Sequence, residues 1–160
     1  MKKHILGFPR IGAQRELKKA LESFWKGEST LEELSAYGSS LRHKHWSLQQ
    51  NADLSWVATG DFSMYDKMLD TSVMLGLLPE RFSHLAPDDM EAYFTLARGD
   101  VKNNIPAMEM TKWFNTNYHY IAPEFSKEDT FELSWLQLFE EVRGNNLLPL
   151  RKPFIQNRHD

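Results

Sequence analysis

Apolar residues recur at helical spacing in two stretches near the start of the chain. In the first, over 15–26, the residues on one face are Leu17, Leu21, Phe24 and Trp25, and Gly27 ends the pattern. The second, about 30–51, begins with Thr30 and Glu33, whose spacing matches a capping box. Its apolar stripe consists of Leu31, Leu34, Leu41, Trp46 and Leu48. Both stretches are predicted to be amphipathic helices.

The rest of the chain alternates between short apolar runs and further helical patterns. We expect strands at 4–8, 54–59 and 111–117, and helices at 64–75, 87–97 and 135–142. Gly76 ends the first of these helices, and Ser134 is the predicted cap of the last. Strands separated by helices predict βαβ units, a parallel sheet and an α/β fold. Because helices outweigh strands, a mostly helical fold is the alternative.

Composition narrows the class of protein. The 160 residues fit one domain, and ten Phe, five Trp and five Tyr are far too many for a disordered chain. A net charge of -3 without a long like-charge block argues against binding to nucleic acid. The absence of cysteine excludes disulfides and thiolate metal ligands within this chain and fits a reducing compartment. We find no signal-peptide core and no membrane span, so a cytoplasmic protein is expected.

The most suggestive charged site is the start of the first helix. Arg15 and Lys18 lie on one side of it, next to backbone N–H groups that carry a partial positive charge. Such a site suits a ligand with carboxylates or phosphates, although an ordinary solvated helix face is the common alternative.

Other polar residues are weaker candidates. His43 and His45 are two positions apart on a helix and would point in different directions, so a structural role is favoured over metal binding. Asp61 follows a predicted strand and is either a site residue or a helix cap. The segment 110–120 combines Lys112 with amides and aromatics, which indicates either polar recognition or packing at a subunit or domain contact. We see no Ser–His–Asp arrangement, P-loop or dinucleotide fingerprint.

Three segments resemble known sequences in the same order. LGFPRIGAQRELKKALESFWKG at 6–27, GDFSMYDKMLDTSVMLG at 60–76 and EMTKWFNTNYHYIAPEF at 109–125 are similar to the amino-terminal half of cobalamin-independent methionine synthases. The resemblance covers about residues 4–140. It implies transfer of a methyl group from 5-methyltetrahydropteroyltriglutamate to homocysteine, with zinc binding the homocysteine thiol. It also implies two face-to-face (βα)8 barrels, the carboxyl-terminal one holding zinc and homocysteine.

The resemblance also assigns residues. It places contacts to the folate polyglutamate tail at Arg15, Glu16, Leu17, Lys18 and Lys112, and no catalytic or metal-binding residue in this chain. Zinc is therefore expected in the full-length family and not on this chain. The expected partners are polyglutamylated folate and the missing carboxyl-terminal barrel.

Chain length limits what this chain can do. A (βα)8 TIM barrel takes about 250 residues, so 1–142 is predicted to form only the first few βα units of an incomplete barrel, and 143–160 a divergent tail. We expect a chain that is inactive alone. The alternatives are a folate-binding or docking module for a separate catalytic chain, or a non-functional truncated remnant.

Overall fold

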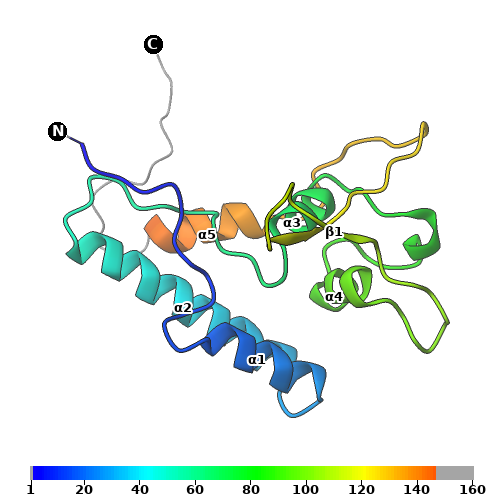
Figure 1. Ribbon diagram of the computed structural model, residues 1–160, viewed down its shortest axis with the longest axis horizontal. Helices are drawn as coiled ribbons and strands as arrows, with labels where there is room; N and C mark the ends of the chain where they lie inside the picture. Colours follow the sequence, from blue (N-terminus) through cyan, green and yellow to red (C-terminus); the bar gives the residue numbers. More distant parts are fainter. Residues whose placement is uncertain (1, 147–160) are drawn as a thin grey trace. The chain divides into compact units, whose positions relative to one another are not determined.

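The structure is a computed structural model that describes residues 2–146. It is an α/β arrangement rich in helix and poor in sheet (Figure 1). The described residues divide into two compact units. The first contains residues up to Met64 together with the segment from Gln137, and the second is Tyr65–Leu136. None of the described helices is long and apolar enough to cross a membrane.

The first unit is built on the two helices predicted with the clearest pattern. α1 spans Glu16–Trp25 and packs against α2, Leu31–Asn51, as Figure 1 shows. The capping box is confirmed, because the Glu33 amide donates to Thr30 Oγ1 at 3.2 Å and the Thr30 amide donates to Glu33 Oε2 at 2.8 Å. Such a cap contributes about 1 kcal/mol. The apolar stripes meet in a core that includes Leu17, Leu21, Leu34, Leu41 and Trp46.

The predicted strands at 4–8 and 54–59 are wrong as hydrogen-bonded strands, because both segments are irregular and bend, at Leu6 in the first and at Ser55 and Trp56 in the second. Their polar groups are satisfied in other ways. The buried Gln49 of α2 accepts a hydrogen bond from the Ala58 amide through Oε1 at 2.9 Å. The Ala58 amide thus donates to a side chain, whereas in a sheet it would donate to the carbonyl of a neighbouring strand.

The same two segments nevertheless lie side by side and run in the same direction. Near their starts, the Ser55 amide donates to the Lys3 carbonyl at 2.8 Å. Near their ends, the Phe8 amide donates to Asp61 Oδ2 at 2.5 Å. The order of the contacts is that of a parallel pair joined by a helical crossover.

The second unit packs two short helices and a 3₁₀ turn around an apolar core. These elements are α3 (Lys67–Met74), η1 (Glu80–Phe82) and α4 (Met90–Arg98). Compared with the predicted 64–75 and 87–97, each helix begins about three residues later, because Asp66 and Asp89 cap them. Asp66 Oδ2 accepts from the Leu69 amide at 3.0 Å, and Asp89 Oδ1 accepts from the Glu91 amide at 3.0 Å.

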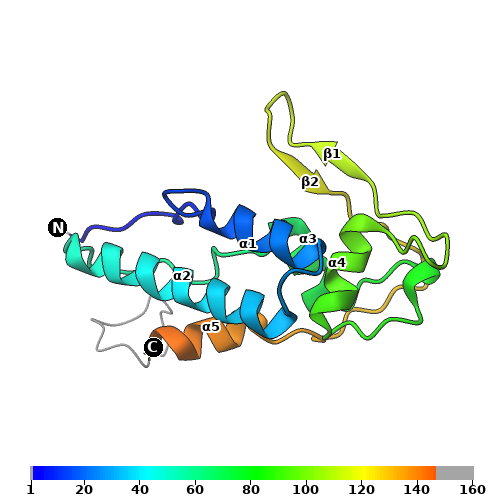
Figure 2. The same cartoon turned by 90° about the horizontal axis from the view of Figure 1, so that it is seen from below.

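A hairpin replaces the single strand predicted at 111–117. β1 (Met110–Lys112) pairs antiparallel with β2 (His119–Ile121), and the intervening residues form the turn. This antiparallel pair is the sheet that the described residues form, and the predicted parallel sheet is not found among them. Figure 2 shows the hairpin projecting from α3 and α4.

The last described helix returns to the first unit. α5 spans Gln137–Asn146, slightly later than the predicted 135–142. Ser134 does not cap it; its hydroxyl instead donates to the Val73 carbonyl at 2.5 Å. α5 contains the beginning of the predicted tail, and 147–160 lie outside the described residues.

Candidate functional site

The start of α1 combines two exposed cations with an anion of its own. Arg15 precedes the helix with left-handed backbone angles (φ 61, ψ 35), and its side chain and that of Lys18 are exposed. Lys18 pairs with Glu22 one turn later at 3.4 Å, a surface pair that a stronger anion can displace at small cost. Both cations are therefore accessible to a ligand.

Glu16 occupies part of the helix start that was predicted to receive a ligand. Its Oε2 accepts from the Gln14 amide at 2.8 Å, and its Oε1 lies 3.5 Å from Lys44 Nζ. Hydrogen bonds from its own amide and from that of Gln14, followed by the charge of Lys44, lower the pKa of Glu16. The backbone donors at this helix end are thus partly used by the protein itself, and the exposed side chains carry the remaining attraction for an anion.

The other two predicted contacts have different surroundings. Leu17 is fully buried at 0% exposure, so its side chain anchors α1 to the core. Lys112 ends β1, is exposed, and stands opposite His119 in the hairpin. The structure therefore brings Arg15, Glu16, Leu17 and Lys18 together in one turn of the first unit. Lys112 belongs to the second unit.

Asp61 and His45 both contact Phe8. The Asp61 carboxylate accepts the Phe8 amide, and the His45 ring stacks on the Phe8 ring at 4.6 Å between centroids. Burial is the largest influence on His45 and lowers its pKa, against the opposing charge of Asp61. The prediction that Asp61 could cap the following helix is wrong, because Asp66 caps α3.

The histidine pair behaves as two separate structural side chains. His43 Nδ1 is 2.8 Å from the Ser39 carbonyl, one turn back in α2, whereas His45 faces Phe8. Within residues 2–146 we find no group of three His, Cys, Asp or Glu side chains that could hold a metal ion.

Asp66 is a buried hub that the sequence did not single out. Beyond capping α3, its Oδ2 accepts from the Ile121 amide at 3.0 Å and its Oδ1 from the Tyr118 hydroxyl at 3.0 Å. Asp66 is 4% exposed, and its carboxylate joins the start of α3 to the residue before β2 and to the last residue of β2. The only local signal was an Asp at a helix start; its partners lie more than 50 residues away.

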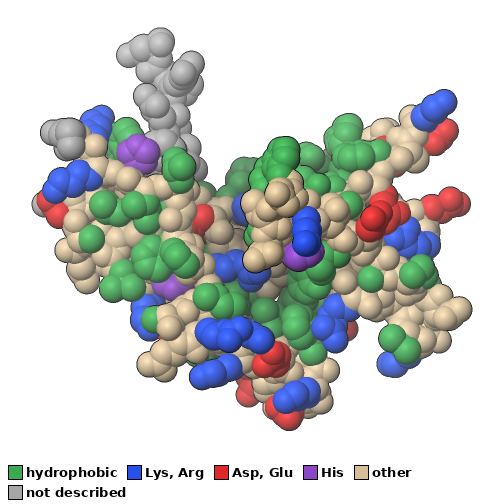
Figure 3. Space-filling view, in the orientation of Figure 1, with side chains coloured by type: hydrophobic (Ala, Val, Ile, Leu, Met, Phe, Trp, Pro, Cys, Tyr) green, Lys and Arg blue, Asp and Glu red, His purple; other side chains and the backbone are tan. Residues whose placement is uncertain are grey.

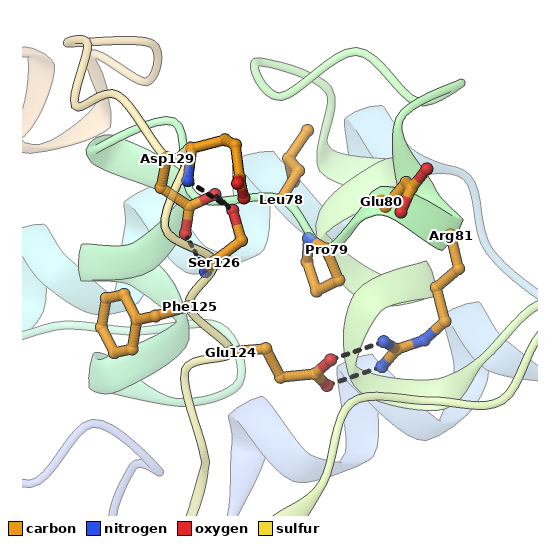
Figure 4. A pocket seen from close by; sticks show the side chains of 9 residues that line it. Leu78, Pro79, Glu80, Arg81, Glu124, Phe125, Ser126 and Asp129 are labelled. Atoms are coloured by element: carbon orange, nitrogen blue, oxygen red, sulfur yellow. Dashed lines mark hydrogen bonds and ion pairs between the residues drawn. The ribbon is translucent and has the colours of Figure 1, made fainter.

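A hollow of about 730 Å³ in the second unit is a different candidate (Figure 4). Arg81 and Glu124 face one another in it, with guanidinium nitrogens 2.5 and 2.6 Å from the two carboxylate oxygens. The remaining charged side chains lining the hollow are all carboxylates: Glu80, Glu128 and Asp129. Because the single cation is already paired, this hollow disfavours a polyanionic ligand and acts as a clamp between η1 and the segment after β2.

We expect this clamp to contribute stability that depends on pH. The hydrogen bonds from Arg81 are the largest influence on Glu124 and lower its pKa. A lowered folded pKa means that the contribution is complete above the unfolded value of about 4.3 and is lost as the pH falls through the folded value. Since about a third of each side chain is exposed, Arg81→Ala should cost about 1 kcal/mol at pH 7.

Urea denaturation at pH 7 and pH 3 checks this prediction. The difference between Arg81→Ala and the unaltered chain should shrink at pH 3. Glu128→Gln, in the same hollow, is the control and should leave the pH dependence unchanged. An Arg81→Ala difference of equal size at both pH values would contradict the clamp.

Comparison with known proteins gives this geometry a context. Residues 2–155 match the family described as "Cobalamin-independent synthase, N-terminal domain". Among curated proteins, the chain is 51% identical over 157 residues to the 5-methyltetrahydropteroyltriglutamate--homocysteine methyltransferase of Vibrio vulnificus. It is 52% identical over 145 residues to that of Vibrio cholerae and 51% over 149 residues to that of Nitrosomonas europaea.

These alignments cover nearly the whole of this chain but little of each relative. They include 92%, 87% and 91% of the chain, but only 20%, 19% and 19% of the three methyltransferases. The chain thus spans about a fifth of the length of the curated relatives it matches. On the family match and these identities, the chain belongs to the amino-terminal domain family of the cobalamin-independent methionine synthases.

Proposed function

We propose that this chain forms part of an enzyme that transfers a methyl group from 5-methyltetrahydropteroyltriglutamate to homocysteine, in methionine biosynthesis. Its share is to contact the polyglutamate tail, and it does not complete the reaction alone. The observation that carries the proposal is the family match over 2–155 in a chain that spans a fifth of its relatives. A cytoplasmic location is part of the same proposal.

The chemistry of the tail fits the accessible charges. A triglutamate tail carries several carboxylates, and Arg15, Lys18 and Lys112 are exposed cations. Arg15 can engage one carboxylate through two N–H groups, whereas Lys18 and Lys112 act as mobile point charges. Glu16 fixes the helix start and Leu17 holds α1 on the core, so both position the cations without needing to touch the ligand through their side chains.

We further propose that the described residues correspond to the first units of a (βα)8 barrel. The parallel course of the segments around 3–8 and 55–61, joined through α1 and α2, supports this arrangement. Barrel strands obtain their ladders from neighbours on both sides. The ladder that these segments lack would form when further strands join them.

Zinc belongs to the family proposal, and the described residues of this chain are not proposed to hold it. The sequence has no cysteine, and the described residues offer no three-ligand group of metal-binding side chains. Because these donors do not fit a zinc site, we assign thiol activation and methyl transfer to the part of the protein beyond this chain.

A chimera tests the proposal. The chain would replace the matching fifth of the Vibrio vulnificus methyltransferase, and methionine formation would be measured with triglutamyl and monoglutamyl methyl-folate. We expect no turnover by the chain alone and turnover by the chimera. Arg15→Ala with Lys18→Ala should raise KM for the triglutamyl substrate about tenfold or more, with a smaller effect on the monoglutamyl substrate and on kcat.

Lys19→Ala is the matched control, because Lys19 is exposed on the same helix but is not assigned to the tail. Equal KM changes for both substrates would contradict tail binding by α1. Adding Lys112→Ala separately tests the cation of the second unit.

The alternative is a free-standing folate-binding module. One observation favours it: Arg15, Lys18 and Lys112 are all exposed in this chain by itself. Calorimetry of the 160-residue chain with triglutamyl folate distinguishes the two functions. Heat of binding that disappears in the Arg15→Ala, Lys112→Ala variant would favour the module. Binding that appears only in the chimera favours the incomplete enzyme.

A further inference from the structure

The turn of the hairpin exposes large aromatic side chains. Trp113, Phe114 and Tyr118, which we call the aromatic tip, are 45%, 83% and 51% exposed. In Figure 3 hydrophobic side chains gather over the hairpin. Exposed aromatic side chains grouped on one turn are unusual for a face that meets only water, and they are typical of protein interfaces.

The backbone holds this surface in one shape. The Trp113 amide donates to the Tyr118 carbonyl at 2.8 Å, and the Thr116 hydroxyl donates to the Trp113 carbonyl at 2.6 Å. Between them Phe114 takes a left-handed φ of 51°, which costs a bulky residue about 1–2 kcal/mol. That conformation presents Phe114 to the outside, with its ring edge-to-face against Trp113 at 5.2 Å.

The base of the hairpin is fixed to the core of the second unit. The Tyr118 hydroxyl and the Ile121 amide both donate to the buried carboxylate of Asp66. A surface that is ordered before binding loses little conformational entropy when a partner covers it. Asn115 and Asn117 add exposed amides beside the aromatics, which is the mixture of an apolar centre with a polar rim found in interfaces.

We propose that the aromatic tip is the docking surface for the part of the methyltransferase that lies beyond this chain. The proposal rests on the proposed function. The relatives are about five times as long as the aligned segment, so an intramolecular partner of ample size exists in each of them. Trp113 and Phe114 serve as the anchoring side chains, and the amides of Asn115 and Asn117 hydrogen-bond at the edge of the contact.

Thiol labelling tests this surface directly, because the chain has no cysteine of its own. Asn115→Cys places a reporter inside the aromatic tip without removing an aromatic side chain. Val101→Cys is the matched control, since Val101 lies in another loop of the same unit and is 91% exposed. Each variant would be labelled with a thiol-specific reagent in the chain alone and in the Vibrio vulnificus chimera, with the labelled peptide quantified by mass spectrometry.

We expect labelling at position 115 to be about tenfold or more slower in the chimera than in the chain alone, which corresponds to about 1.4 kcal/mol of protection. Labelling at position 101 should be equally fast in both. Adding Phe114→Ser to the reporter should restore faster labelling in the chimera. A chimera that does not fold is replaced by mixing the chain with the remaining four fifths of the methyltransferase as a separate polypeptide.

Several outcomes would overturn the proposal. Equal labelling at position 115 with and without the rest of the protein rejects docking. Slow labelling at position 115 in the chain alone also rejects docking. If that slow labelling depends on protein concentration, a second copy of the chain covers the aromatic tip. If it does not depend on concentration, the chain covers its own tip. Methyl transfer is scored separately, so an active chimera with an unprotected tip rejects only the docking surface. A protected tip in an inactive chimera rejects only the proposed function.

Discussion

Asp66→Ala is expected to destabilise the second unit by about 3 kcal/mol and to detach the hairpin from it. The substitution removes the cap of α3, which is worth about 1 kcal/mol. It also leaves the buried Ile121 amide without its acceptor, and an unsatisfied donor costs about 1–3 kcal/mol when water cannot reach it. The Tyr118 hydroxyl loses the same acceptor, at a smaller cost because its side chain is half exposed.

Chemical denaturation followed by tryptophan fluorescence measures this loss. Asp89→Ala is the matched control, because Asp89 also caps a helix through its carboxylate but is exposed and makes a local bond. It should cost only about 1 kcal/mol. If the two alanine variants lost the same stability, Asp66 would be an ordinary cap and not a hub.

Arg42→Met is expected to cost about 3 kcal/mol in the first unit. Arg42 of α2 lies 3.8 Å from Glu141 of α5, with only 16% and 3% of the two side chains exposed. Burial is the largest influence on the pKa of Arg42 and lowers it, whereas the charge of Glu141 raises it. The guanidinium also lies over the Phe62 ring, 5.0 Å from its centroid. Removing the cation leaves a buried carboxylate uncompensated, which is the expensive way to break such a pair.

The double variant Arg42→Met, Glu141→Leu separates the cost of an unpaired buried carboxylate from the net contribution of the ion pair to stability. Replacing both partners by apolar side chains removes the uncompensated charge, so we expect most of the lost stability to return. Lys44→Met is the control: Lys44 is 56% exposed in its pair with Glu16, and its loss should cost less than about 1 kcal/mol. A double variant as unstable as the single one would contradict the explanation.

The predicted site residues illustrate how far a sequence pattern reaches. Arg15 and Lys18 are exposed on the turn where the resemblance places them, but the pattern did not indicate that Glu16 would use the neighbouring amides. Leu17, assigned to the tail, is a core side chain. The role of all of them, and of Lys112, in tail binding stays a prediction.

Local features of the chain were readable from sequence alone because their partners lie within one or two turns. The helices of the first unit follow from apolar residues at helical spacing, and the Thr30–Glu33 box depends on residues three positions apart. Family membership is readable for a related reason: its signatures are contiguous segments, and the family match confirms them.

Only the tertiary structure decided how distant segments share hydrogen bonds. Whether 4–8 and 54–59 become strands depends on partners elsewhere in the chain, and here Gln49 and Asp61 side chains take amides that a ladder would use. The Asp66 hub joins residues about 50 positions apart in the chain. Such pairings are chosen by the burial of whole surfaces and the satisfaction of every enclosed polar group, which no local pattern records.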